Sequence, residues 1–318
     1  MIRNLLLVVA LGLCWGLNWP AVKLALGEIP PWTLRAFAFW LATAILFGVL
    51  MAMGRSLSVP RQHWVRLAVV GTLSIAGYNI FSAFAQLTAT TSRAAVLSYT
   101  MPIWAVIFAR IVLGEAFDRR RVIGLALGAA GLTALGWPLL MSGQLSIGLF
   151  YAVMSGVVWA AGSVILKRWP IAASALVITA WQMGFAALVM TIGMIAFEGL
   201  PARLPVLSST YVGLVYNVLI GQALATTLWF TILGLMPAGT AAIGSLLVPA
   251  VGVVGATIIL GERPTVPDWM GLVFIVAAAA VVLVRRPPSV PAPVEATATD
   301  RSSSSAILAG RPNRSSTD

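Results

Sequence analysis

The chain has 318 residues, of which 60% are hydrophobic and only 9% are charged, and its formal charge is +11. Soluble domains contain about 45–50% apolar and about 25% charged residues, so this composition excludes an ordinary soluble domain and indicates a membrane protein. The cations lie between apolar stretches, where Lys and Arg report orientation in a membrane, so we expect a lipid bilayer and no nucleic acid as partner.

Apolar stretches of about 20 residues, the length that crosses a hydrocarbon core about 30 Å thick, recur along the sequence. They predict an all-α integral membrane protein with ten transmembrane helices. In chain order these helices cover residues 4–23, 33–53, 64–87, 91–113, 120–139, 146–167, 173–196, 209–234, 239–260 and 267–284. The division between the third and fourth helices rests on the short segment "LTATTS" alone.

The basic residues predict the orientation of these helices. With the N-terminus inside, twelve Lys and Arg fall on the inner side and five on the outer side, leaving out the C-terminal tail. The positive-inside rule then places both termini in the cytoplasm of a multi-pass protein in the bacterial inner (plasma) membrane. A secretory signal peptide at the start is rejected, because no small-x-small cleavage site ends the first apolar run. The Pro- and Ser-rich segment 287–318 predicts a disordered cytoplasmic tail.

The first predicted helix contains "CWGLNWPAVK", in which Trp15, Asn18, Trp19 and Val22 share one helical stripe. An unpaired amide in hydrocarbon costs several kcal/mol, roughly 4–8 on the apolar-transfer scale, so we expect this stripe to face the protein interior. Pro20 should weaken the helix there. An interfacial aromatic belt is the alternative for the two Trp residues.

Polar residues also gather in the third and eighth predicted helices. Tyr78, Asn79 and Ser82 share a face of the third helix, and the eighth helix contains Asn217, Gln222 and Trp229. We expect these two helices to face each other across a central cavity. Interhelical hydrogen bonding, worth about 0.6 kcal/mol on average in membranes, is an equally good interpretation of the third helix.

An internal repeat predicts the architecture. Residues 94–124 match residues 241–271 with a shift of 147, keeping Ser, Pro, Gly-Glu and Gly in register without a gap. Each half has five predicted helices, an odd number, so the second half enters the membrane from the opposite side. The chain should therefore form two five-helix inverted repeats, residues 4–139 and 146–284. Such halves can open a central site alternately to each side, which favours a transporter over a static duplicated fold.

For several residues a structural role has to be weighed against a functional one. Pro102 and Pro249 lie inside predicted helices, each one turn after a Ser, and are candidate hinges. Glu115 and Glu262 occupy matching helix ends, which favours a structural role over a proton site. Arg35 can pair with a carboxylate, but it is expected to snorkel to the interface. No cation is predicted at mid-depth to bind a phosphorylated substrate.

With these residues in place, the sequence resembles the EamA branch of the drug/metabolite transporter superfamily over residues 4–285. The resemblance is carried by "CWGLNWPAVK", "RAAVLSYTMPIWAVIFARIVLGE" and "AAIGSLLVPAVGVVGATIILGE". It implies ten helices in two inverted repeats around a central cavity and the export of small metabolites, and it is nearest to exporters of aromatic and other amino acids. The second-half segment "VWAAGSVILK" lacks the Asn and the second Trp of its partner.

These observations predict a non-enzymatic exporter of small metabolites, namely aromatic and other neutral amino acids, that works by facilitative alternating access. The alternative is an exporter of lipophilic drugs, cations or nucleosides, with or without proton coupling. No cofactor or metal site is expected, since no metal-ligand motif occurs, and the protein should be a monomer or weak dimer. The candidate substrate-binding residues are Trp15, Asn18, Tyr78, Asn79, Ser82, Ser98, Tyr99, Trp159, Ser163, Asn217, Gln222, Trp229 and Ser245.

Overall fold

A computed structural model describes residues 2–116, 119–141, 143, 146–235 and 247–283. All described residues belong to one compact unit of the chain, residues 1–285. Every secondary-structure element among them is helical, and those residues form no strand. The predicted tail at 287–318 and Ser245 lie outside the described residues.

The first half of the chain contains the helices α1 to α8. They are α1 (Ile2–Gly16), α2 (Asn18–Ala25), α3 (Pro31–Ala52), η1 (Arg61–His63), α4 (Trp64–Val70), η2 (Gly71–Gly77), α5 (Tyr78–Thr88), α6 (Thr91–Ser98), α7 (Met101–Leu113) and α8 (Arg119–Met141). Several of these join end to end into longer rods, so α1 with α2, and α4 with η2 and α5, each form one membrane-length helix.

The second half of the chain is helical as well. Its helices are α9 (Ile147–Arg168), α10 (Ala175–Gly193), η3 (Met194–Glu198), α11 (Ser208–Val215), η4 (Tyr216–Leu224), α12 (Ala225–Leu235), α14 (Leu247–Leu260) and α15 (Val266–Leu283). In the described parts of the chain, eight helices are long and apolar enough to cross a membrane. Two shorter apolar helices, Leu247–Leu260 and Val266–Val281, fall where the ninth and tenth spans are predicted.

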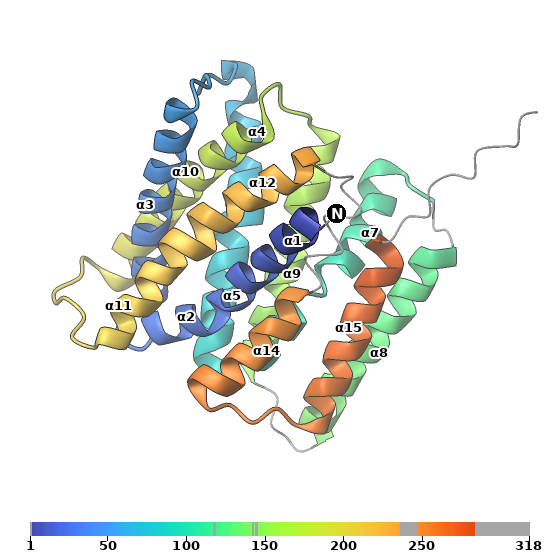
Figure 1. The fold of residues 1–318 in the computed structure, drawn as a ribbon. Helices are drawn as coiled ribbons and strands as arrows, with labels where there is room; N and C mark the ends of the chain where they lie inside the picture. The colour runs from blue at the N-terminus through green and yellow to red at the C-terminus, as the bar shows by residue number, and fades with distance from the viewer. Residues whose placement is uncertain (1, 117–118, 142, 144–145, 236–246, 284–318) are drawn as a thin grey trace, which may run out of the picture. The chain divides into compact units, whose positions relative to one another are not determined.

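Helices distant in the sequence pack side by side (Figure 1). The most extensive contact joins α8 to α15, and α3 packs on α10, α5 on α9 and α1 on α14. Small residues allow these close approaches: a Cβ added at Gly271 would lie 2.3 Å from the Leu135 side chain. Close packing around small residues is the usual source of helix association in membranes, where no hydrophobic force draws helices together.

Two of the predicted proline sites coincide with helix breaks. Leu17 separates α1 from α2, and the N-terminal turn of α2 contains Pro20, which has no N–H to donate to the preceding turn. Tyr99 and Thr100 separate α6 from α7, so Pro102 lies in the first turn of α7 and not inside a continuous helix as expected. Proline is well tolerated there because the N–H it lacks would be unpaired anyway.

The third and eighth predicted spans each contain a π-helical stretch, η2 and η4. In a π-helix the hydrogen bonds join residue i to residue i+5, so the helix is locally wider than an α-helix. Its side chains therefore point in other directions than the 3.6-residue period of an α-helix would give. Such segments often occur at functional sites. Here they place polar side chains of two distant segments on the same internal space, as described next.

Candidate functional site

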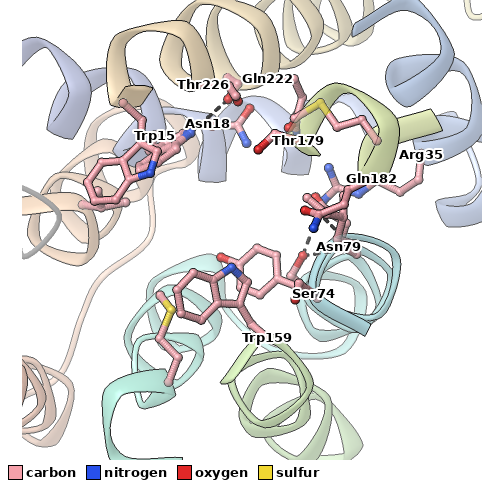
Figure 2. Close-up of a pocket in the computed structure, with 18 of the residues that line it drawn as sticks. Trp15, Asn18, Arg35, Ser74, Asn79, Trp159, Thr179, Gln182, Gln222 and Thr226 are labelled. Carbon is pink, nitrogen blue, oxygen red and sulfur yellow. Dashed lines mark hydrogen bonds between the residues drawn. The ribbon is translucent and has the colours of Figure 1, made fainter. Parts of the chain in front are cut away.

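A cavity of about 350 Å³ lies among the helices, lined by residues of both halves of the chain (Figure 2). Pockets for small molecules usually measure about 300–1,000 Å³, so this one suits a small metabolite. Its wall is contributed by α1, α2, α3, η2, α5, α9, α10, η4 and α12, together with Val70, Tyr99, Met101 and Val248.

Most of the predicted site residues share this wall. The cavity is lined by Trp15, Asn18, Tyr78, Asn79, Ser82, Tyr99, Trp159, Ser163, Gln222 and Trp229. The third and eighth predicted spans therefore both face it, as the polar pattern predicted. Ser98 and Asn217 lie behind the wall, and Ser245 is outside the described residues.

Aromatic rings form one side of the cavity. The rings of Trp15 and Trp229 lie 5.8 Å apart between centroids, at 43° to each other. The indole N–H of Trp15 donates to the backbone oxygen of Gly221 over 3.1 Å, which fixes the ring against η4. Tilted aromatic pairs of this kind are worth about 0.5–1.5 kcal/mol beyond their buried area. The arrangement offers a preformed apolar surface to a ligand.

Asn217 supports this wall from behind. Its side-chain amide nitrogen donates to Oδ1 of Asn18 over 2.8 Å, and Asn217 itself is fully buried. Gly221 makes room for the pair, because a Cβ there would lie 2.2 Å from the same oxygen of Asn18. The amide of Asn18, whose placement in an apolar helix needed explanation, thus has a protein partner. Asn217 positions Asn18 and does not reach the cavity.

Ser98 has a packing environment. Its hydroxyl donates to the backbone oxygen of Ala152 and accepts a hydrogen bond from Ser155 over 2.7 Å. These bonds join α6 to α9 and leave the Ser98 side chain fully buried. The packing alternative of the sequence analysis describes this residue better than a lining role.

Arg35 is the main correction to the sequence analysis. It was expected to snorkel to the interface, but the residue is only 2% exposed and lines the cavity from the second turn of α3. Its Nη2 donates to the Ser82 hydroxyl over a long 3.4 Å, while Nε and Nη1 have no partner among the described residues. The expectation that Arg35 snorkels to the interface is therefore wrong.

Five further polar residues of the cavity wall were also missed. They are Ser74, Gln86, Thr179, Gln182 and Thr226. Gln86 comes four residues after Ser82, and Thr226 four residues after Gln222, so each continues a polar helical face that contains a predicted residue. Thr179 and Gln182 lie three residues apart on α10, a spacing that puts both on one helical face. That spacing was the available signal.

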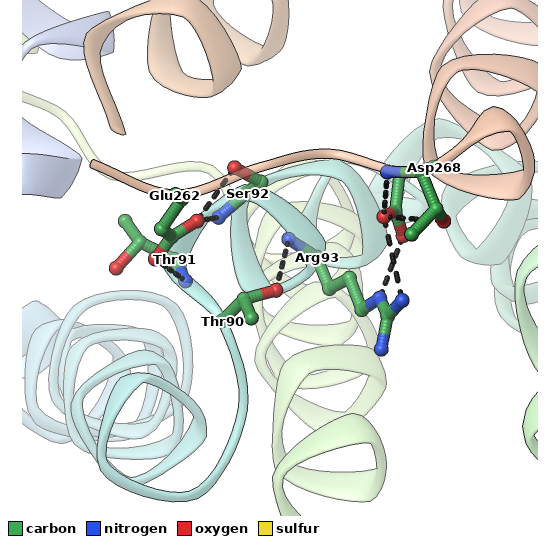
Figure 3. Close-up of polar contacts among 7 residues, drawn as sticks. Thr90, Thr91, Ser92, Arg93, Glu262 and Asp268 are labelled. Carbon is green, nitrogen blue, oxygen red and sulfur yellow. Dashed lines mark hydrogen bonds and ion pairs between the residues drawn. The ribbon is translucent and has the colours of Figure 1, made fainter. Parts of the chain in front are cut away.

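Two carboxylates bind the start of α6 (Figure 3). Glu262, which follows α14, accepts hydrogen bonds from the backbone N–H groups of Thr91 (2.6 Å) and Ser92 (2.9 Å) and from the Ser92 hydroxyl (2.6 Å). It thereby caps α6, whose first N–H groups have no partner within the helix. Beside it, Arg93 pairs with Asp268 over 2.6 Å. These contacts match the structural role expected for Glu262.

Two more carboxylates cap helices in the same way. Glu198 accepts from the N–H groups of Trp32 and Thr33 at the start of α3. Glu28 accepts hydrogen bonds from the N–H groups of Val206 and Leu207, which precede α11, and from the hydroxyl of Thr210 in its first turn. These hydrogen bonds, that of Thr210 foremost, lower the pKa of the Glu28 carboxyl. Each cap joins one half of the chain to the other.

Glu115 has a different environment from its sequence partner Glu262. Its carboxylate binds Nζ of Lys167 and the guanidinium of Arg121. The hydrogen bond from Lys167, with that from Arg121, lowers the pKa of Glu115. Glu115 follows α7, so it lies at the opposite end of the 91–113 span from the α6 cap. Among the residues the structure describes, no cluster of three His, Cys, Asp or Glu could hold a metal ion.

Comparison with known proteins identifies the family. The model of the EamA-like transporter family matches the chain twice, over residues 2–137 and 146–284. The aromatic amino acid exporter YddG of Ancylobacter novellus is 30% identical over 159 residues, covering 48% of this chain and 55% of that protein. The uncharacterized inner membrane transporter YedA of Escherichia coli K12 is 25% identical over 274 residues, which cover 86% of this chain and 88% of that protein.

A third relative is a probable amino-acid metabolite efflux pump of Salmonella typhimurium, 24% identical over 83% of this chain and 89% of that protein. The resemblance seen in the sequence is confirmed over both halves of the chain. Together with the membrane-length helices and the internal cavity, these matches show that the chain belongs to the EamA-like transporter family.

Proposed function

We propose that this membrane transporter exports small metabolites, namely aromatic and other neutral amino acids, across the bacterial inner membrane. The observation that carries the proposal is the single cavity that ten predicted residues from both halves line. Its aromatic side fits an apolar side chain, and its Asn, Gln, Ser and Thr groups can orient polar ends. The relatives named as amino-acid exporters and as an inner membrane transporter support substrate class and location.

The proposal includes ten helices in two inverted repeats, 4–139 and 146–284, with both termini in the cytoplasm. Two observations support the repeat. The family model matches each half separately. The π-helical stretches η2 and η4 also occupy similar positions in the two halves. Their first residues, Gly71 and Tyr216, are 145 positions apart, close to the shift of 147 in the sequence repeat. A monomer or weak dimer suffices for this mechanism.

Alternating access is supported by the positions of the carboxylate contacts that join the two halves of the chain. Glu262 and Asp268 of the second half bind the start of α6 in the first half, and Glu115 of the first half binds Lys167 of the second. These two groups of contacts lie at opposite ends of the 91–113 span. Contacts between two similar halves can break at one end and form at the other, which is what alternating access requires.

Facilitative transport is the energetic part of the proposal. No Asp, Glu or His is among the described residues that line the cavity. Proton-driven carriers commonly load and release protons on such groups inside the membrane. The alternative cargo of lipophilic cations is disfavoured by Arg35, because a buried positive charge repels a second one at close range. We therefore retain a neutral, zwitterionic substrate.

The test is substrate counterflow in proteoliposomes. Vesicles loaded with one unlabelled amino acid should take up the same labelled compound, with saturation, whereas protein-free vesicles should not. Trp159→Ala removes a cavity ring and should raise the half-saturating concentration about tenfold, the worth of about 1.4 kcal/mol. Trp137→Ala, an exposed Trp outside the cavity, is the matched control and should leave the flux unchanged. No amino-acid flux, with nucleosides or dyes transported instead, would refute the proposal.

A further inference from the structure

The Arg35 guanidinium is a buried cation without a counter-ion. The residue is 2% exposed, and among the described residues two of its three guanidinium nitrogens have no hydrogen-bond partner. The third makes only the long contact with Ser82 there. Within the described ranges, the ion pairs are Arg93–Asp268, Arg121–Glu115 and Lys167–Glu115, and none includes Arg35. A buried charge is costly unless it is paired and hydrogen-bonded.

The cavity gives an anion a route to Arg35. The residue belongs to the cavity wall, and its neighbours on the same face of α3 are apolar and closely packed, including Phe39 and Ala42, both fully buried. None of the described wall residues is an Asp or Glu. A molecule inside the cavity can supply the missing acceptor.

A second unpaired donor lies beside the first (Figure 2). Nε2 of Gln182 is buried and has no partner in the part of the chain that the structure describes. Its helix α10 packs directly on α3, which carries Arg35. Asn79 lies next to both in the same view. The aromatic rings of Trp15 and Trp159 lie on the other side of the space, as Figure 2 shows. The cavity thus has a cationic, donor-rich end and an aromatic end.

We propose that the guanidinium of Arg35 binds the carboxylate of the substrate, with the side-chain amide of Gln182 as an additional donor. The inference deepens the proposed function, on which it rests, by naming the group that is recognised: a carboxylate joined to an apolar or aromatic remainder. Hydrogen bonds between Arg and a carboxylate are charge-assisted and stronger than neutral ones. A site built for such a group rejects analogues that lack it, because its buried donors then stay unpaired.

Four probes that share a phenyl ring isolate the carboxylate: L-phenylalanine, 3-phenylpropanoate, 2-phenylethylamine and L-phenylalaninamide. Binding to the purified full-length protein in detergent is measured by calorimetry. We expect the two carboxylates to bind at least a hundredfold more tightly than the amine and the amide. Equal binding of the amine or the amide, or no binding of either carboxylate, overturns the inference.

Variants of Arg35 separate binding from folding. Arg35→Gln should weaken 3-phenylpropanoate at least a hundredfold, and Arg35→Lys should retain part of the affinity because it keeps the charge. Arg55→Gln, at an exposed arginine outside the cavity, is the matched control and should bind as the wild type does. If carboxylate affinity survives in Arg35→Gln, the inference fails.

The thermal stability of the ligand-free protein gives a readout independent of ligand. Removing an uncompensated buried charge should leave the melting temperature of Arg35→Gln equal to or above that of the wild type. A clear decrease would mean that Arg35 has a structural partner, and would overturn the inference. Carboxylate binding without amino-acid counterflow would refute the proposed function alone, whereas counterflow in which the amide and the amino acid compete equally would refute this inference alone.

Discussion

Glu262→Ala tests whether the α6 cap holds one end of the transporter closed. The substitution removes three hydrogen bonds of 2.6, 2.9 and 2.6 Å to Thr91 and Ser92. A helix cap is worth about 0.5–2 kcal/mol, and bonds to a charged acceptor about 1.5–3 kcal/mol. Water replaces part of this at the partly exposed Glu262, so we take about 2 kcal/mol for the whole contact. That shifts a two-state equilibrium about thirtyfold toward the state open at this end.

The shift is measured with a single cysteine at Val22 in a Cys14→Ser background. Val22 is 1% exposed and lines the cavity, and the next residue, Lys23, lies near Glu262. An impermeant maleimide is added to each membrane face, and the Glu262 face is identified by a separate cysteine at exposed Arg263. Labelling of Val22→Cys from that face should rise about thirtyfold in Glu262→Ala and about fivefold in Glu262→Gln, which keeps one acceptor oxygen.

Glu115→Ala provides the directional control, because it breaks the contact with Lys167 at the opposite end. Labelling from the Glu262 face should not increase in this variant. Unchanged labelling in folded Glu262→Ala, or an equal rise in both variants, would refute the idea that the cap keeps this end closed.

Two further predictions concern single contacts, and a third concerns the energy source of transport. Gly213→Ala places a Cβ 2.3 Å from the backbone oxygen of Ala21, so α11 and α2 must move apart. Thermal unfolding should show that the free energy of unfolding falls by about 1–3 kcal/mol. Gly48→Ala, where an added Cβ would meet no neighbouring atom within 4 Å, should show no such loss. The lowered pKa of Glu115 means that its contact stabilises the protein above the ordinary value of 4.5 and is lost as pH falls through the lower folded value, so the melting temperature should fall more steeply below pH 4.5 in the wild type than in Glu115→Gln. With equal substrate on both sides of a proteoliposome, an imposed pH or sodium gradient should produce no accumulation, and uphill uptake would contradict facilitative transport.

The candidate site was predicted best where polar residues interrupt apolar helices. Asn18, Tyr78 and Gln222 stand out in such surroundings, and all three line the cavity. The same logic did not separate lining from packing. Asn217 and Ser98 are as polar as the others, but their hydrogen bonds go to Asn18 and to α9. Sequence spacing places a residue on a helical face, whereas a rotation of a few tens of degrees decides whether that face meets a cavity or a neighbouring helix.

The sequence by itself determined the class of protein, the helical secondary structure and the family, because a bilayer admits only helices or closed barrels and sets their length. Only the tertiary structure decided which side of each helix is internal. In α3, Phe39, Ala42 and Leu46 are fully buried while Phe37, Trp40 and Leu41 are 47–50% exposed, although both groups are apolar. Lipid and protein interior are equally apolar, so the sequence shows no contrast between them. Arg35 shares the buried face with Phe39, and its position at the cavity follows from packing alone.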